Sequence, residues 1–217
     1  MKRQFAIASA GRTASTSLYD TLVATLQVRN SVYPIWDLSP ANLLAEVYAG
    51  DRFDYVVVKS EAFHFIHHLR FRDRTTLILL TRRDHLRQIV SHIVSLRSGR
   101  FHATGAVPAQ AEPFHIAKAE PFQIERHEFL FLAHMVLMME AHFRTADFAG
   151  FDRVERWTFE DLVADFLGHL GLLGLQHPRR MDRTGVGYDA GTVLNLPEVL
   201  DWAADLAADG LRVGSPA

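Results

Sequence analysis

The sequence contains no cysteine among its 217 residues, which excludes disulfides, cysteine-containing zinc sites and thiol nucleophiles. It also lacks a strong net charge, because 23 basic and 25 acidic side chains leave a formal charge of -2. Such a balance provides no basic field for nucleic acid or for an anionic membrane surface. Apolar runs stay far below the roughly 18 residues of a membrane span, and none matches the core of a signal peptide. We therefore expect a soluble, cytoplasmic protein without a nucleic-acid partner or a membrane span.

What the sequence does have is an alternation of short aliphatic runs and longer amphipathic segments. Residues 4–9, 54–58 and 75–81 are typical of strands covered on both faces of a parallel sheet. Residues 84–96 and 123–143 show apolar side chains at helical spacing. This order predicts an α/β fold in three layers, with a central, mostly parallel sheet flanked by helices.

One long segment interrupts that order. Residues 99–122 carry three prolines and two glycines, and they are too long and too broken for an ordinary connection. We expect a single domain over 1–217 in which 99–122 is an insertion that covers the substrate. The apolar stretch 129–139 is a candidate surface for a homodimer, although core packing would explain it equally well.

A first candidate site lies between the strand at 4–9 and the helix that follows it. Residues 8–18 read A-S-A-G-R-T-A-S-T-S-L, which places hydroxyls and one arginine at a helix N-terminus. Backbone N–H groups and the helix dipole favour an anion at such a position. The Walker A pattern is absent, because no Gly-Lys pair follows Gly11, and this argues against ATP or GTP hydrolysis. A simple turn with a helix cap is the competing interpretation.

A second candidate segment follows the strand at 75–81. Arg82 and Arg83 end this strand, and Ser91 comes eight residues after Arg83 on the polar side of the next helix. Guanidinium groups at a strand end are well shaped for phosphate. The competing interpretation is a solvated helix face on which the arginine side chains reach toward water.

Taken together, these segments resemble PAPS-dependent sulfotransferases. The run G-R-T-A-S-T-S-L at 11–18 is similar to their 5′-phosphosulfate loop, and 83–91 is similar to their 3′-phosphate segment. A third match, W-T-F-E-D-L at 157–162, resembles the Y-E-D-L segment of the family. The likeness is nearest to bacterial trehalose-type and other carbohydrate sulfotransferases. It implies a P-loop-like fold, PAPS as co-substrate, PAP as product, no metal, and a hydroxyl of a small-molecule or glycan acceptor.

The resemblance also implies a set of donor-binding residues. Those for the 5′-phosphosulfate are Arg12, Thr13, Ala14, Ser15, Thr16 and Ser17. Those for the rest of the nucleotide are Arg83 and Ser91 at the 3′-phosphate, Phe159 near adenine, and Arg183 with Gly185 as the nearest counterpart of a late phosphate-binding element. Ala14 replaces the usual loop glycine, so we expect its φ to be negative, because a Cβ disfavours the left-handed region.

The acceptor must lose a proton, which requires a general base. The run K-S-E-A-F-H at 59–64 resembles the family's K-T-H segment, which implies that Lys59 contacts the transferring group and that Glu61 is the base. Asp37 is the chief rival, and His64 is a further candidate. The histidines of 64–68 lack a nearby carboxylate or cysteine partner, so we interpret them as a helix surface and expect no metal site.

Two other classes of protein remain open at this point. A non-catalytic protein that binds PAP or another nucleotide would bind without transferring a group, since fold does not imply function. Another phosphate-handling P-loop protein, such as a kinase, would need the Gly-Lys-Ser/Thr sequence that is missing here.

Overall fold

In the computed structural model of the chain, the described residues are 3–27, 31–32, 55–60, 66, 69, 72–98, 121–175 and 192–214. The chain divides into two compact units, which are described separately. The first comprises Met1–Arg82 and Met138–Asp182, and the second comprises Arg83–Leu137 and Arg183–Ala217. Most of the expected insertion at 99–122 lies outside the described residues, so this insertion and the single domain over 1–217 stay predictions.

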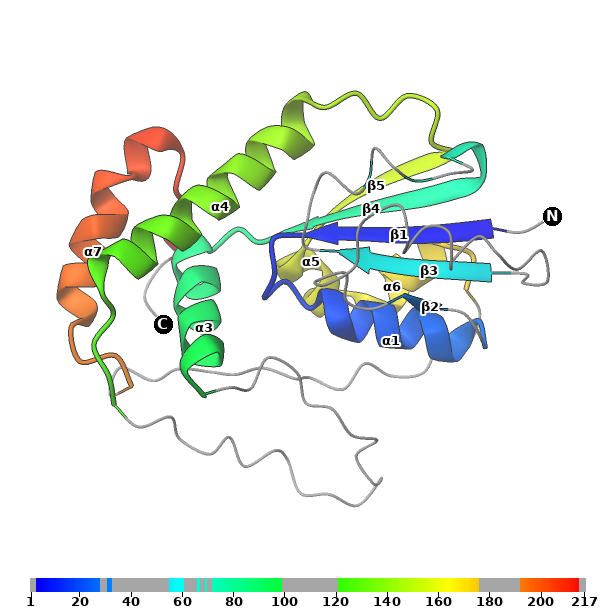
Figure 1. Cartoon of the computed structure of the whole chain (residues 1–217). Coiled ribbons are helices and arrows are strands. Elements are labelled where there is room, and N and C mark those ends of the chain that lie inside the picture. The colour runs from blue at the N-terminus through cyan, green and yellow to red at the C-terminus, as the bar shows by residue number, and fades with distance from the viewer. Residues whose placement is uncertain are drawn as a thin grey trace, which may run out of the picture. The chain divides into compact units, whose positions relative to one another are not determined.

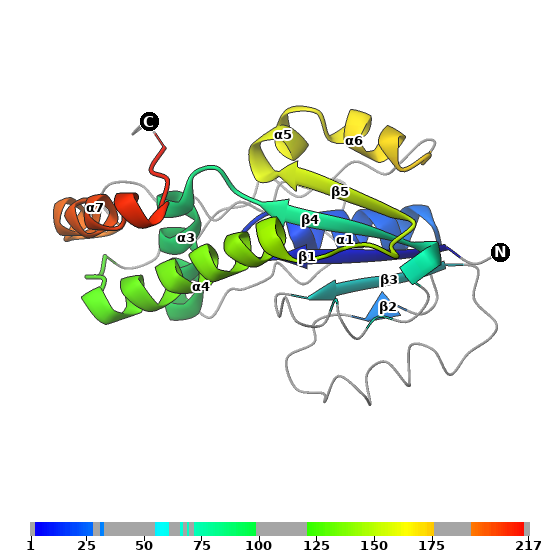
Figure 2. The same cartoon turned by 90° about the horizontal axis from the view of Figure 1, so that it is seen from above.

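The first unit is built on a sheet of five parallel strands (Figure 1). These are β1 (Arg3–Ser9), β2 (Ser31–Val32), β3 (Tyr55–Ser60), β4 (Thr75–Thr81) and β5 (Arg153–Thr158). Their order across the sheet is β2-β3-β1-β4-β5, and the view from above shows the strands fanning out in this sequence (Figure 2). The prediction of an α/β fold with a parallel central sheet is confirmed.

The register aligns the carboxyl ends of the strands along one edge. Ala8 pairs with Ser60 of β3, Ser9 pairs with Leu80 of β4, and Thr81 pairs with Thr158 of β5. The strand order reverses at β1, because β2 and β3 lie on one side of it and β4 and β5 on the other. Ligands of open α/β sheets bind outside the carboxyl ends of the strands at such a reversal.

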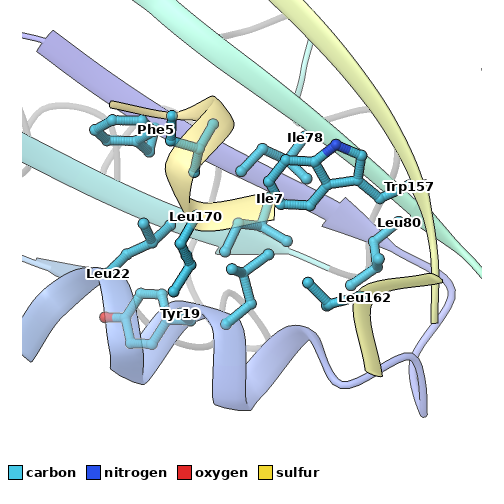
Figure 3. Close-up of a cluster of buried hydrophobic side chains, with 11 residues drawn as sticks. Phe5, Ile7, Tyr19, Leu22, Ile78, Leu80, Trp157, Leu162 and Leu170 are labelled. Atoms are coloured by element: carbon cyan, nitrogen blue, oxygen red, sulfur yellow. The ribbon is translucent and has the colours of Figure 1, made fainter. Parts of the chain in front are cut away.

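One face of this sheet is covered by three helices (Figure 3). They are α1 (Ser15–Thr25), α5 (Phe159–Ala164) and α6 (Phe166–Leu172). Phe5 and Ile7 of β1 point to this face and share a fully buried cluster with Leu18 of α1, Leu162 of α5 and Leu170 of α6. Because successive side chains of a strand alternate between faces, the even-numbered residues of β1 must point the other way.

The opposite face packs against the second half of α4 (Arg126–Thr145). Ala6 and Ala8 of β1 share a buried cluster with Met139 and Phe143 of that helix. Both faces of β1 are therefore buried, which is why its sequence reads as a nearly continuous apolar run. The same reasoning explains the aliphatic run of β4.

The segment after β5 forms two short helices, α5 and α6. The first begins at Thr158, whose hydroxyl accepts a hydrogen bond from the Asp161 N–H at 3.2 Å. Asp165 separates them, with φ −137°, and its carboxylate accepts from the Gly168 N–H at 3.0 Å to cap the second helix.

The second unit is mainly helical in its described part, with one isolated bridge between Phe122 and Val193. It contains α3 (His85–Ser98), the first half of α4, α7 (Leu196–Asp205) and the short η3 (Ala207–Asp209). The ring of Phe129 on α4 lies 6.1 Å from that of Trp202 on α7. Helices were predicted at 84–96 and 123–143, and α3 and α4 are present there with ends shifted by a few residues.

Exposed apolar side chains gather on α4. Phe131 is 66% exposed and Met138 is 58% exposed, and Met135 lies between them on the helix. The homodimer proposed for this stretch stays a prediction. No helix within the described ranges combines the length and apolarity required to cross a lipid bilayer.

Candidate functional site

The loop between β1 and α1 has an unusual backbone. Gly11, Arg12 and Ala14 have φ of 74°, 53° and 60°, so three of four consecutive residues are left-handed. Backbones that combine left-handed residues with others turn successive N–H groups into a concavity that favours anions. The loop follows the central strand of the sheet, at the edge where the strand order reverses. The candidate anion loop is thus placed where α/β sheets bind their ligands.

Hydroxyl groups lie within this loop and are withdrawn from solvent. The side chains of Ser9 and Thr13 are fully buried and Ser15 is 3% exposed. Neither Ser9 Oγ nor Thr13 Oγ1 has a hydrogen-bond partner among the described residues. Burying a hydroxyl without a partner is costly, so these two oxygens mark a place where a bound group would restore lost hydrogen bonds.

Ala14 contradicts its predicted conformation. We expected a negative φ because of its Cβ, whereas Ala14 has φ 60° and ψ 15° and is the N-cap residue of α1. The left-handed region costs an alanine roughly 1–2 kcal/mol. The close turn from β1 into α1 therefore outweighs the preference of alanine for a negative φ. Ala14 also offers no capping side chain, so α1 begins without a side-chain hydrogen bond at its N-cap.

Arg82 was singled out at the strand end but not assigned a role, and the structure ties it to this loop. Its Nη1 donates to the Arg12 carbonyl oxygen at 3.2 Å, and its guanidinium carbon lies 4.4 Å from the centre of the Phe159 ring. Its Nε lies 3.9 Å from a carboxylate oxygen of Glu160. Sequence alone could not distinguish it from Arg83, because either could have turned inward.

Phe159 was predicted to lie near adenine. It directly follows Thr158 at the carboxyl end of β5, so it shares the edge of the sheet with the loop after β1. One side of its ring is covered by the Arg82 guanidinium. The adenine contact stays a prediction.

Two further predicted nucleotide contacts, Arg83 and Ser91, belong to the second unit. Arg83 is exposed and lies two residues before the start of α3, while Ser91 is 6% exposed within that helix. The Ser91 carbonyl accepts a hydrogen bond from the Ser95 hydroxyl at 2.8 Å. The unit that holds the loop does not by itself contain these two residues, so their role at a 3′-phosphate stays a prediction.

The predicted catalytic residues are described only in part. The backbone of Lys59 pairs with that of Ile7 near the carboxyl end of β3, so Lys59 belongs to the same edge of the sheet as the loop. Asp37, Glu61, His64, Arg183 and Gly185 lie outside the described residues. Within the described ranges, no three side chains of the types that ligate metals gather into a group.

No model of a known protein family matches the chain, and no curated protein matches its sequence. Among solved structures, the chain is similar to the crystal structure of mouse sulfotransferase SULT7A1 complexed with PAP, at 11% sequence identity and a TM-score of 0.48. That match covers 80% of this chain and 58% of the mouse chain, so less than two thirds of the mouse protein is spanned. The chain is also similar to a sulfotransferase from Alicyclobacillus acidocaldarius, at 14% identity and a TM-score of 0.43, over 99% of this chain and 98% of that one. Both of these structural neighbours are sulfotransferases.

Proposed function

We propose that the protein is a sulfotransferase that moves the sulfuryl group of PAPS to a hydroxyl of a small-molecule or carbohydrate-like acceptor. The observation that carries this proposal is the loop at 10–17. Its residues resemble a 5′-phosphosulfate loop, and it follows the central strand at the reversal of strand order. Its left-handed backbone and its buried, unpartnered Thr13 hydroxyl supply the donors that an anion requires. The proposed fold is accordingly P-loop-like and three-layered, with the Walker A lysine absent.

The reaction needs charge stabilisation more than covalent chemistry from the protein. The S–O bond between the sulfuryl group and the 5′-phosphate breaks, and a bond forms from sulfur to the acceptor oxygen. The leaving 5′-phosphate gains negative charge, which Arg12 and the hydroxyls of the loop are suited to stabilise through charge-assisted hydrogen bonds. The products are PAP and a sulfate ester.

The acceptor proton passes to a general base, for which Glu61 is the first candidate and Asp37 and His64 are the alternatives. Lys59 would contact the transferring group from the end of β3. In this proposal Arg83 and Ser91 hold the 3′-phosphate, Phe159 contacts adenine, and Arg183 with Gly185 completes the phosphate contacts. No metal takes part.

The first experiment is a calorimetric titration of the purified protein with PAP. ATP and AMP are the matched ligands, because they share the adenosine and differ in their phosphates. Binding of PAP that is lost in Arg83→Ala supports the donor site. Binding of ATP without binding of PAP contradicts the proposal and favours another phosphate-handling protein.

A second experiment tests transfer and the base. Radiolabelled sulfur in PAPS would be followed into a panel of sugars and small hydroxyl compounds. If Glu61 is the base, Glu61→Gln binds PAP normally but turns over at least a hundredfold more slowly. An active Glu61→Gln enzyme transfers the role to Asp37 or His64, which Asp37→Asn and His64→Gln then separate. PAP binding without transfer to any acceptor favours the non-catalytic alternative.

A further inference from the structure

A single side chain joins the carboxyl ends of three strands in the first unit. Arg82 follows β4 directly and its side chain is 13% exposed. It contacts the backbone of Arg12 in the loop after β1, and it contacts Phe159 and Glu160 in the first turn of the helix after β5. Turn positions favour small or polar residues, so a long, mostly buried arginine is unusual at this position. These contacts indicate that Arg82 has a specific structural role at this edge of the sheet.

The hydrogen bond from Arg82 to the Arg12 carbonyl determines the direction in which the Thr13 N–H points. The peptide bonds of the described residues are all trans, so the C=O and the N–H of one peptide unit point in opposite directions. The Arg12 carbonyl faces the Arg82 guanidinium at 3.2 Å, and the Thr13 N–H must therefore face away from it. Arg12 has φ 53°, a conformation that a side chain disfavours, and the bond from Arg82 is a contact from outside the loop that stabilises it.

The other two contacts hold the guanidinium in place. Its central carbon lies over the Phe159 ring, 4.4 Å from the ring centre, which is a cation–π contact. Glu160 balances its charge from 3.9 Å. A lysine could keep the charge, but it could not cover the ring and donate to the carbonyl with one rigid group.

We propose that Arg82 is a positioning residue for the donor loop. Through the Arg12 carbonyl it maintains the left-handed turn and directs the Thr13 N–H to the side on which the 5′-anion binds. The identity of that anion rests on the proposed function. The claim that Arg82 supports the loop rests only on the contacts of Arg82. It gives Arg82 a function separate from that of Arg83, its neighbour in the sequence.

The support of the loop is tested without any ligand, by hydrogen exchange of the amides at 11–17. Arg82→Met removes the bond to the carbonyl, and amide exchange in the loop should become at least tenfold faster. Arg144→Met is the matched control, because it removes an exposed arginine in the last turn of α4, and its loop should exchange as in the wild type. Equal exchange in Arg82→Met and the wild type would overturn the inference. Arg82→Lys, which keeps the charge, gives the same test should the methionine variant not fold.

The consequence for binding is tested with PAP in a double-mutant cycle. Arg82→Met should raise the Kd for PAP at least tenfold, because the competent loop becomes a minor conformation. Ala14→Gly makes the left-handed turn easier, so the same Arg82→Met change should raise Kd only about threefold in that background. A general loss of stability would not produce this rescue. Equal penalties in both backgrounds would contradict the inference.

The two proposals fail in different ways. If the wild type does not bind PAP, the proposed function is wrong, while faster loop exchange in Arg82→Met still supports the positioning role. If the wild type binds PAP and Arg82→Met binds it equally well with an unchanged loop, the positioning role is wrong and the donor site stands.

Discussion

Two helices of the first unit begin at the same edge of the sheet and begin differently. α5 follows Thr158, whose extended backbone and hydroxyl cap the helix by accepting from the Asp161 N–H. α1 follows Ala14, which is left-handed and has no capping side chain. The first N–H groups of any helix have no partner within it, so each start must be completed by something else. At α5 the chain supplies that group itself.

Two further described helices, α6 and α4, are capped by side chains of the chain itself, whereas α7 begins at Asn195 without a side-chain cap hydrogen bond. The Asp165 carboxylate accepts from the Gly168 N–H at the start of α6. The Glu128 carboxylate accepts from the Glu125 N–H at 3.1 Å at the start of α4. The segment before α1 is richer in hydroxyls than any of these, yet the N-cap position itself is an alanine. What sets the start of α1 apart from that of α7 is its left-handed loop with the buried Thr13 hydroxyl, which is the feature on which the proposed anion site depends.

The start of α1, which has no side-chain cap, is called the open start, and that of α5, which Thr158 caps, the closed start. The largest expected effect is the loss of PAP affinity when the charge of Arg12 is removed from the open start. Arg12→Ala should weaken PAP binding by about 2 kcal/mol, or about thirtyfold, because it removes the charge-assisted contact that we propose to the 5′-anion. Calorimetric titration measures the change. Arg144→Ala is the control, since Arg144 is an exposed arginine in the last turn of α4. Equal affinities of Arg12→Ala and the wild type would show that the anion does not lie at this loop.

A pair of threonine variants distinguishes the open start from the closed one. Thr13→Val removes a buried, unpartnered hydroxyl, so the unliganded protein should gain about 1 kcal/mol in free energy of unfolding and lose affinity for PAP. Thr158→Val removes a cap, so it should lose about 1 kcal/mol in stability and keep its affinity. Urea unfolding and PAP titration of both variants measure the two quantities. Changes of the same sign in the two variants would remove the distinction between the starts.

The backbone of the open start can be tested by a matched pair of glycines. Ala14→Gly relieves a left-handed φ at the cost of a more flexible unfolded chain, and it should stabilise the protein by about 0.5 kcal/mol. Ala141→Gly, in α4, should destabilise it by about 1 kcal/mol, because glycine is a poor helix former. Thermal unfolding compares the two. A loss of stability in Ala14→Gly would show that the turn is not strained.

The sheet could be predicted from the sequence because a strand buried on both faces has a continuous run of apolar residues. The run at 75–81 was predicted as a strand and forms β4 with the same bounds. β2 has only two residues, Ser31 and Val32, and so short a strand carries no periodic pattern. Its pairing with β3 is imposed by the rest of the sheet. The break at Asp165 could have been found, since an aspartate followed three residues later by a glycine N–H is an ordinary capping signal.

The site was predictable in its residues more than in its geometry. The loop at 11–18 was found because its composition and its place after a strand are both local features. The left-handed φ of Ala14 was not, because local preference opposes it and the turn into α1 prevails. The role of Arg82 was hidden for a related reason. Its partners Arg12 and Phe159 are 70 and 77 residues away in the sequence, and only the parallel register brings them to one edge.

The smallest expected effect is a change in stability at the start of α4, where the capping group is the charged carboxylate of Glu128. Burial alone would raise the pKa of Glu128, but hydrogen bonds from Arg97 and from the Glu125 N–H, with the charges of Arg97 and His127, outweigh it and lower the pKa. A lowered pKa means that the carboxylate stabilises the fold above its unfolded pKa, near 4.5, and that this contribution is lost as the pH falls through the lowered value. Glu128→Gln should therefore be less stable than the wild type by about 0.3 kcal/mol at pH 7, a small value because the ion pair is partly exposed. Urea unfolding at pH 7 and pH 3 should show the difference shrinking at the lower pH, and a difference that is independent of pH would contradict a cap that depends on charge.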